Sequence, residues 1–185
     1  MIKTPGEESG RLQPPGTPGI PGIPGVPGVG LQPPVSESQL DAEMDLAAAS
    51  ILVVDDHEQN LELLHAYLED VGCRVRSARD GLLALQEVEA EAPDLIVLDV
   101  MMPRMSGFQL CAKLKSEPAT RDIPIVMVTA LSDVGDVERA VESGADDFLT
   151  KPVHRIELVT RVKSLLRYRL LKKQFDELMR RERGA

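Results

Sequence analysis

Carboxylates follow two short apolar runs of the chain. Leu95-Ile96-Val97-Leu98 leads directly to Asp99, and Ile51-Leu52-Val53-Val54 leads to the pair Asp55-Asp56. Four consecutive apolar residues are typical of a central strand in a parallel sheet, which is buried on both faces. In open α/β sheets, ligands bind beside the carboxyl ends of the strands. These three carboxylates are therefore the first candidates for a functional site.

Two later apolar runs also lead to polar side chains. Pro124-Ile125-Val126-Met127-Val128 is followed by Thr129 and Ala130, and Phe148-Leu149-Thr150 is followed by Lys151. If each run is a strand of one parallel sheet, all the strands end at the same rim of that sheet. The residues expected to converge on this rim are Asp55, Asp56, Asp99, Thr129 and Lys151.

These residue types suit phosphoryl transfer assisted by a divalent cation. Three carboxylates held close together repel one another, and a hard cation such as Mg²⁺, or Mn²⁺ in its place, relieves that repulsion. A lysine and a hydroxyl supply a positive charge and a donor for a phosphoryl group, while a carboxylate such as Asp99 can form an acyl phosphate. Taken singly, each residue also fits a generic polar loop end, with Lys151 paired to an acid for stability.

Helical patterns separate the predicted strands. Another short and more polar run, Arg74-Val75-Arg76-Ser77-Ala78, is typical of an edge strand, so five strands are expected. This alternation predicts an α/β fold with a parallel sheet, right-handed crossovers and helices on both faces. The second helix, from Gly81 to Glu91, is expected to bury Leu82, Leu85 and Val88. The other helices are marked by Leu61, Leu64, Leu68 and Val71 before Gly72; by Phe108, Cys111 and Leu114; and by Val134, Val137 and Val141 before Gly144.

The beginning of the chain has a different composition. Residues 1–46 hold 9 of the 14 prolines and 8 of the 14 glycines and contain no aromatic residue. Such a segment cannot bury enough apolar surface to offset the entropy of ordering. Glycine recurs at every third residue from Gly16 to Gly28, as in collagen, but the repeat is too short to hold a triple helix unaided. We therefore predict that residues 1–47 form a disordered, partly polyproline-like tether.

Charge and hydropathy exclude some classes of partner. The formal net charge is −9, which argues against general affinity for nucleic acid or for an anionic membrane. No 18 consecutive apolar residues occur and no apolar signal-peptide run follows Met1, so we expect a cytoplasmic protein that is not inserted in a membrane. Cys73 and Cys111 lack metal-ligand spacing and are expected to be buried, reduced thiols.

The chain ends in a long predicted helix. From His154 to about Arg183 there is neither Gly nor Pro, which would give a helix of roughly 45 Å. Ile156, Val159, Val162 and Leu166 are expected to pack on the sheet. The apolar residues that continue at helical spacing beyond the sheet are Tyr168, Leu171, Phe175 and Leu178. An apolar stripe that leaves its domain needs a partner, either a second copy of the chain or another protein.

Taken together, the motifs at the strand ends resemble a known family. They are Val53-Val54-Asp55-Asp56; Asp99 with Met102-Pro103, Met105 and Gly107; Val128-Thr129-Ala130; Gly144-Ala145-Asp146; and Lys151-Pro152. On these motifs, residues from about 49 to 170 are similar to the receiver domain of two-component response regulators. The resemblance implies a flavodoxin-like, doubly wound, five-stranded sheet with strand order 2-1-3-4-5. It implies a receiver domain at residues 48–168, followed by a helical extension at 169–185.

Carried over residue by residue, the resemblance assigns the carboxylates. It makes Asp99 the phosphoacceptor and Asp56 a direct Mg²⁺ ligand. Asp55 would act largely through water, and the backbone carbonyl of Met101 would complete the protein ligands.

The resemblance also assigns the groups that bind the phosphoryl oxygens. Thr129 and the Ala130 amide would bind these oxygens, and Lys151 would form an ion pair with them. Phe148 takes the place of the family's switch aromatic, which turns inward as Thr129 moves toward the phosphate. Because Phe148 has no hydroxyl, its packing can switch but it cannot form the hydrogen bond of a tyrosine.

Three positions near the predicted site depart from the family or remain open. Met101 and Leu131 occupy positions that tune loss of the phosphoryl group, and neither can orient a water molecule, so slow self-dephosphorylation is predicted. His57, beside the acidic pair, is interpreted as an exposed loop histidine, with a phosphodonor or a metal ligand as the alternatives.

The resulting prediction is a phosphorylation-dependent switch and not an enzyme acting on an external substrate. It would receive its phosphoryl group from a sensor histidine kinase or a phosphotransfer protein and would control dimerisation or a downstream protein through its C-terminal helix. That continuation looks similar to those of receivers that precede diguanylate cyclase or cyclic-dinucleotide phosphodiesterase domains, although no output domain is expected in this chain. The alternatives are a receiver-like scaffold that is never phosphorylated and a Mg²⁺-dependent phosphatase. The phosphatase is disfavoured because such an enzyme would need a second Asp at the position of Met101.

Overall fold

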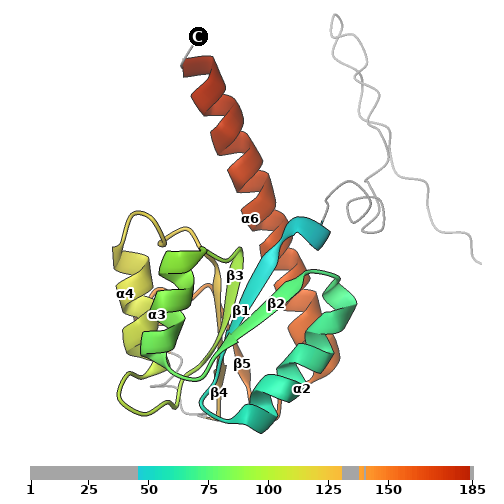
Figure 1. Ribbon diagram of the computed structural model, residues 1–185, viewed down its shortest axis with the longest axis vertical. Helices are drawn as coiled ribbons and strands as arrows, with labels where there is room; N and C mark the ends of the chain where they lie inside the picture. The colour runs from blue at the N-terminus through green and yellow to red at the C-terminus, as the bar shows by residue number, and fades with distance from the viewer. Residues whose placement is uncertain (1–45, 131–137, 140, 184–185) are drawn as a thin grey trace, which may run out of the picture. The chain divides into compact units, whose positions relative to one another are not determined.

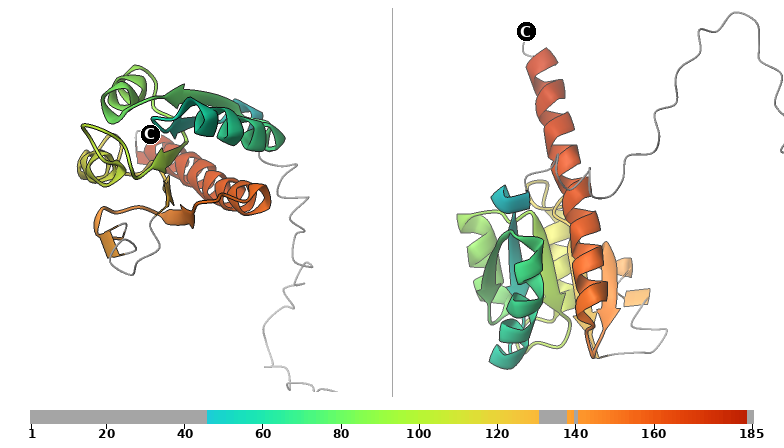
Figure 2. Two further views of the ribbon diagram at one scale, coloured as in Figure 1. Left: turned by 90° about the horizontal axis from the view of Figure 1, so that it is seen from below. Right: turned by 90° about the vertical axis from the view of Figure 1, so that its right-hand side faces the viewer.

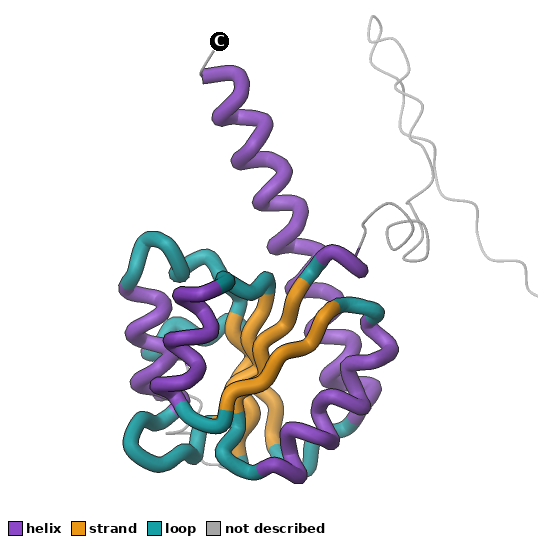
Figure 3. The backbone as a smooth tube through the Cα atoms, viewed as in Figure 1, coloured by secondary structure: helices purple, strands orange, loops and turns teal. Residues whose placement is uncertain are grey.

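A five-stranded parallel sheet forms the centre of the computed structural model, which describes residues 46–130, 138–139 and 141–183. The strands are β1 (Ser50–Val54), β2 (Arg74–Ala78), β3 (Leu95–Asp99), β4 (Ile125–Thr129) and β5 (Asp147–Thr150). They lie in the order β2-β1-β3-β4-β5 and are all parallel (Figure 1). Figure 3 shows the strands in orange between the purple helices. The predicted α/β fold and strand order are confirmed, and Arg74–Ala78 is the edge strand expected from its polarity.

Helices cover both faces of this sheet. They are α2 (Glu58–Leu68), α3 (Gly81–Ala90), α4 (Gly107–Ser116) and α6 (Arg155–Arg183), with short 3₁₀ turns η1 (Leu46–Ala48) and η2 (Glu69–Val71). Figure 1 and the left view of Figure 2 show α3 and α4 on one face and α2 and α6 on the other. Alternate residues of β1 follow this division, because Leu52 and Val54 join the core under α3 and α4, whereas Ile51 and Val53 join the core under α2 and α6.

The inward face of α3 differs from the prediction. Val88 is buried and Leu85 is partly buried, but Leu82 is half exposed. Gly81 and Ala84 take the buried positions instead. Small residues on the inner face allow the helix to lie close to the sheet, so the prediction for Leu82 was wrong.

Helix α6 shows a similar difference at its first turn. Leu158, Val162 and Leu166 are fully buried, and each such side chain contributes about 1.5–3 kcal/mol. Val159 is partly buried, but Ile156 is 83% exposed and does not pack on the sheet as expected. The helix spans 29 residues, and its C-terminal half projects beyond the sheet, as the right view of Figure 2 shows.

Other predicted features lie partly outside the described residues. The helix marked by Val134, Val137 and Val141 is described only at residues 138–139 and 141–142, which are helical, and Val141 is exposed. The predicted N-terminal tether lies outside the described residues up to residue 45, as does Leu131. Where the chain is described, no helix is both long and apolar enough to cross a bilayer. Cys111 is a buried free thiol, whereas Cys73 is only partly buried.

Candidate functional site

Asp99 lies at the carboxyl end of the central strand β3 and is almost completely buried. One carboxylate oxygen, Oδ2, accepts a hydrogen bond from the backbone amide of Met101 at 2.8 Å. The other, Oδ1, lies 2.7 Å from Nζ of Lys151. The buried carboxylate is therefore held from both sides, by the loop after its own strand and by the residue that follows β5.

Asp55 follows β1 and has a side chain with no exposed surface. Its Oδ2 atom lies 3.1 Å from Nζ of Lys151, so a single ammonium group contacts both Asp55 and Asp99. Asn60 on α2 donates through Nδ2 to both oxygens of Asp55, at 3.0 and 2.9 Å. Asn60 was not predicted, and its only sequence signal is a polar residue one helical turn before the buried Leu64.

Asp56 and His57 form the more open part of the site. The Asp56 side chain is 23% exposed and the His57 side chain 70% exposed. The ring atom Nδ1 of His57 lies 2.9 Å from Oδ1 of Asp56. The backbone amide of His57 donates to Oδ1 of Asp55 at 2.9 Å, which fixes the turn between β1 and α2.

Of the remaining predicted residues, Thr129, Ala130 and Met101 lie at the same rim, whereas Phe148 lies within β5 (Asp147–Thr150). Thr129 ends β4 and is buried, and the exposed Ala130 follows it. The amide of Lys151 donates to the carbonyl of Thr129 at 2.7 Å, so the ladder between β4 and β5 continues up to the lysine. Phe148 is partly buried against the core under α3 and α4, and Met101 is 60% exposed.

The beginning of α4 is packed directly against the end of β3. A Cβ atom placed on Gly107 would lie 2.3 Å from the carbonyl oxygen of Asp99, so only glycine fits there. Ser106 caps the helix by accepting from the amide of Gln109 in a capping box. The loop between them is also held by Arg104, which pairs with Asp80 at 2.5 Å. These contacts fix the backbone on which Asp99 is mounted.

The electrostatics of the site are unbalanced in favour of negative charge. Three carboxylates (Asp55, Asp56 and Asp99) face one ammonium group, that of Lys151, which leaves a net charge of two negative units. Burial raises the pKa of Asp99 above its ordinary value, although the hydrogen bond and charge of Lys151 act in the opposite direction. Burial alone would lower the pKa of Lys151, but its interactions with Asp99 and Asp55 raise it overall.

This donor set fits a hard divalent cation. Carboxylate oxygens are the ligands that Mg²⁺ prefers, and the excess of two negative charges equals the charge of one such ion. Asp55, Asp56 and His57 also form a group of potential metal ligands whose donor atoms all lie within 4.8 Å of one another. The rim could therefore hold a divalent cation beside the buried carboxylate of Asp99.

Comparison with known proteins agrees with this geometry. The family model that describes the response regulator receiver domain matches residues 51–163. The response regulator PleD of Caulobacter vibrioides is 50% identical over 135 residues, which are 73% of this chain and 29% of PleD. The alkaline phosphatase synthesis transcriptional regulatory protein PhoP of Bacillus subtilis is 45% identical over 117 residues, covering 63% of this chain and 48% of PhoP. The chain thus spans less than half the length of these two relatives.

Solved structures show the same likeness. The signal receiver domain of a signal transduction histidine kinase from Syntrophus aciditrophicus matches with a TM-score of 0.61 and 44% identity, over 64% of this chain and 90% of that one. A CheY-like receiver domain protein from Methanospirillum hungatei matches with a TM-score of 0.63 and 26% identity, over 68% and 98% of the two chains.

Proposed function

Because the chain belongs to the response regulator receiver family, whose members are in general phosphorylation-dependent switches, we propose that it accepts a phosphoryl group on Asp99. The donor is a sensor histidine kinase or a phosphotransfer protein of a two-component system. One observation carries the proposal: Asp99 is buried at the end of the central strand, and Lys151 contacts both Asp99 and Asp55. The setting is cytoplasmic, where such donors act.

In the proposed reaction, an oxygen of Asp99 attacks the phosphorus of a phosphohistidine. A bond forms between that oxygen and phosphorus, the bond between phosphorus and the histidine nitrogen breaks, and the nitrogen leaves with its electron pair. Lys151 stabilises the negative charge that develops on the phosphoryl oxygens, as do the hydroxyl of Thr129 and the amide of Ala130. Phe148 then follows Thr129 as the switch aromatic.

We assign the metal site to the same rim. Asp56, Asp99 and the backbone carbonyl of Met101 would hold Mg²⁺, or Mn²⁺ in its place, and Asp55 would act largely through water. The ion would neutralise the excess negative charge that the carboxylates and the phosphoryl group bring together. Asn60 and Lys151 hold Asp55 in place for this role.

The test is the mass of the intact chain after incubation with acetyl phosphate and Mg²⁺. We expect one stable phosphoryl adduct on Asp99, and none in Asp99→Asn. Asp70→Asn is the matched control, because Asp70 is an exposed carboxylate that pairs with Arg155 away from the rim. Turnover of acetyl phosphate without an adduct would indicate the phosphatase alternative, whereas an unchanged mass would indicate a scaffold that is not phosphorylated.

We further propose that α6 carries the output. The described part of α6 beyond residue 168 extends a receiver domain that we assign to residues 48–168. Four apolar residues from position 168 onward lack cover among the described residues, because each is 54% to 64% exposed. This stripe consists of Tyr168, Leu171, Phe175 and Leu178.

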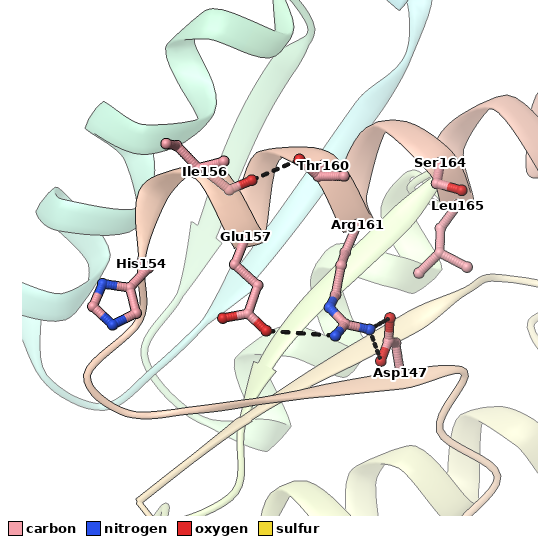
Figure 4. A pocket seen from close by; sticks show the side chains of 8 residues that line it. All are labelled: Asp147, His154, Ile156, Glu157, Thr160, Arg161, Ser164 and Leu165. Atoms are coloured by element: carbon pink, nitrogen blue, oxygen red, sulfur yellow. Dashed lines mark hydrogen bonds and ion pairs between the residues drawn. The ribbon is translucent and has the colours of Figure 1, made fainter. Parts of the chain in front are cut away.

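The same side of the molecule has a shallow hollow beside the first turns of α6. It has a volume of about 600 Å³ and is lined by residues of α6 together with Asp147 of β5. Figure 4 shows Arg161 between Glu157 and Asp147, to which it donates at 3.4 Å and at 2.6 and 2.8 Å. The apolar stripe and this hollow are the surfaces through which phosphorylation would control homodimerisation or a downstream protein.

Sizing before and after treatment with acetyl phosphate tests this output. For dimerisation, we expect a shift toward dimer on phosphorylation, which Phe175→Glu abolishes. Gln174→Glu is the matched control, because it adds the same charge to an exposed neighbouring position outside the stripe. Monomers in every state and variant would exclude the dimer and leave docking of a downstream protein as the output. A receiver with a net charge of −9 is not expected to bind nucleic acid.

A further inference from the structure

The rim also contains a potential nitrogen ligand beside its carboxylates. His57 directly follows Asp56, and its Nδ1 atom lies 2.9 Å from Oδ1 of Asp56 and 3.6 Å from Oδ1 of Asp55. Its ring is 70% exposed, so it is not held in place by packing. From this geometry, we propose that His57 is an additional ligand of the bound cation and shifts the selectivity of the site from Mg²⁺ toward borderline ions such as Co²⁺ and Zn²⁺.

The separation between Nδ1 of His57 and Oδ1 of Asp56 fits shared coordination. Two donors at about 2.1 Å from one ion, at a right angle to each other, are about 3 Å apart. The separation of 2.9 Å agrees with that value, so a cation could bind both atoms with little movement of either side chain. The exposed position of the imidazole also gives it the freedom to adjust.

Asp55 is less available for direct coordination than Asp56. Its Oδ1 atom accepts from the amide of His57 and from Asn60, and its Oδ2 atom accepts from Asn60 and contacts Lys151. A nitrogen from His57 would therefore supply a ligand beside Asp56 that the occupied oxygens of Asp55 cannot supply without losing these partners.

The chemistry of the donor decides which ions benefit. Mg²⁺ prefers oxygen ligands and retains its waters, so it gains little from an imidazole. Co²⁺ and Zn²⁺ bind imidazole well and have a higher intrinsic affinity for mixed nitrogen and oxygen sites. Under this inference, which rests on the proposed metal site, His57 has a small effect on Mg²⁺ binding and a large effect on Co²⁺ binding.

A competing explanation is that His57 merely donates a hydrogen bond to Asp56. In that case, its removal would change the affinity for all divalent ions in the same proportion. Two variants separate these explanations, because His57→Ala removes both donor and ligand, whereas His57→Asn retains a hydrogen-bond donor but is a poor ligand for borderline ions. His154→Ala is the matched control, since His154 is an exposed histidine that precedes α6.

The experiment is calorimetric titration of the full chain at pH 7.5 with Mg²⁺ and, separately, with Co²⁺. The visible absorption spectrum of the bound Co²⁺ is recorded as well, because it reports nitrogen ligation. In both His57→Ala and His57→Asn we expect the Co²⁺ affinity to fall by about tenfold or more, since loss of even an indirect metal partner costs 10–100-fold. The Mg²⁺ affinity should remain nearly constant, and His154→Ala should match the unmodified chain for both ions.

Each outcome decides one question. Equal losses for both ions, or Co²⁺ binding that is unchanged without His57, would overturn the role of His57 as a ligand. Loss of the Co²⁺ preference with Mg²⁺ binding intact supports the role. Absence of Mg²⁺ binding to the unmodified chain would instead count against the metal site of the proposed function, whatever the behaviour of His57. Circular dichroism of the full chain at pH 7.5 and at each ion concentration establishes that the variants remain folded.

Discussion

The contact between Gly107 and the end of β3 allows a test of how tightly the site is built. In Gly107→Ala, the new Cβ would lie 2.3 Å from the carbonyl oxygen of Asp99 and 2.9 Å from Cα of Val100. Ordinary contact begins at 3.4 Å, so α4 and the end of β3 must separate by about 1 Å. Both contacted atoms belong to the backbone and cannot rotate away, as a side chain would.

Two effects of this separation can be estimated. Overpacking typically costs about 1–3 kcal/mol, and for an immovable backbone we expect the upper value, about 3 kcal/mol. For a domain of this size, that loss lowers the melting temperature by roughly 10 °C. A displacement of about 1 Å at a reacting group can cost about 100-fold in rate, so phosphorylation of Asp99 by acetyl phosphate should slow by about that factor.

Two other glycines supply matched controls for the same substitution. Gly72 has a φ of +77° but nothing within 4 Å of its added Cβ, so Gly72→Ala should cost only the left-handed strain, about 1–2 kcal/mol. In Gly81→Ala, the added Cβ would lie 2.8 Å from Sδ, 3.0 Å from Cγ and 3.1 Å from Cβ of Met105, so it meets a side chain that can shift by a few tenths of an ångström and no backbone atom. Both variants should become phosphorylated at the unmodified rate.

The assays are thermal unfolding by circular dichroism and the time course of the phosphoryl adduct by intact mass. A Gly107→Ala variant that melts at the same temperature as Gly72→Ala and becomes phosphorylated at the unmodified rate would refute the tight contact between α4 and β3. If Gly107→Ala is too unstable at 25 °C, the time courses of this variant and of the unmodified chain are both measured at 10 °C, which keeps the comparison of rates possible.

Three further predictions concern pH and the lifetime of the adduct. Because burial raises the pKa of Asp99, the ionised side chain destabilises the metal-free fold, and Asp99→Asn should unfold at a higher temperature at pH 7. This advantage should shrink as the pH falls through the raised pKa of Asp99 and vanish below the ordinary pKa of Asp. Thermal melts across that pH range measure it. The pKa of Asp80 is lowered mainly by the hydrogen bond from the amide of Leu83, so the ionised carboxylate stabilises the fold above the ordinary pKa of Asp. This stabilisation is lost as the pH falls through the lowered pKa. In urea titrations from pH 6 down to pH 2, Asp80→Ala should therefore be less stable than the unmodified chain at pH 6 and equally stable at low pH. Neither the exposed Met101 nor Leu131, which lies outside the described residues, has a side chain that can orient a water molecule. The double variant Met101→Asn, Leu131→Glu should therefore lose its phosphoryl group faster than the unmodified chain, which decay of the adduct mass would show.

The strands β1, β3 and β4 could be predicted because they are buried along their whole length. Runs such as Leu95–Leu98 and Ile125–Val128 have no polar residue to accommodate, and each ends at a side chain of the site. Spacing did not predict the strand order, since it says which segments are strands but not which ones pair. The order came from the resemblance of the motifs at the strand ends to receivers.

The inner faces of the helices were harder to predict because too many of their residues are apolar. In Leu82-Leu83-Ala84-Leu85, more than one helical face fits the periodicity, and the small residues Gly81 and Ala84 decide the face by allowing close packing. At the beginning of α6, Ile156 and Leu158 are both apolar and lie on nearly opposite sides of the helix. Only the position of the sheet selects Leu158.

Asn60 was missed for a different reason. Its function in the site is to donate to Asp55, and that depends on how the first turn of α2 returns to the end of β1. Sequence spacing can place a polar residue on a helix, but it cannot show that both oxygens of a buried carboxylate are turned toward it. The three-dimensional path of the loop from Asp56 to Glu58 supplies that information.

The position of Lys151 explains how chemistry at the rim could reach the apolar stripe. Lys151 contacts Asp99 and lies only four residues before α6 begins at Arg155. If its ammonium group moved from Asp99 toward a phosphoryl oxygen, that movement would act on the segment that leads into the helix. Further along, the helix is attached to the other end of the sheet by pairs between Lys172 and Asp122, at 2.7 Å, and between Lys173 and Asp94. Because α6 is continuous between these two attachments, a shift at its first turn has to be absorbed either by sliding of its buried face or by release of the distal pairs. Either response moves the apolar stripe relative to the sheet. Breaking the pairs at Lys172 and Lys173 should therefore uncouple phosphorylation from homodimerisation or docking of a downstream protein, without affecting the adduct on Asp99.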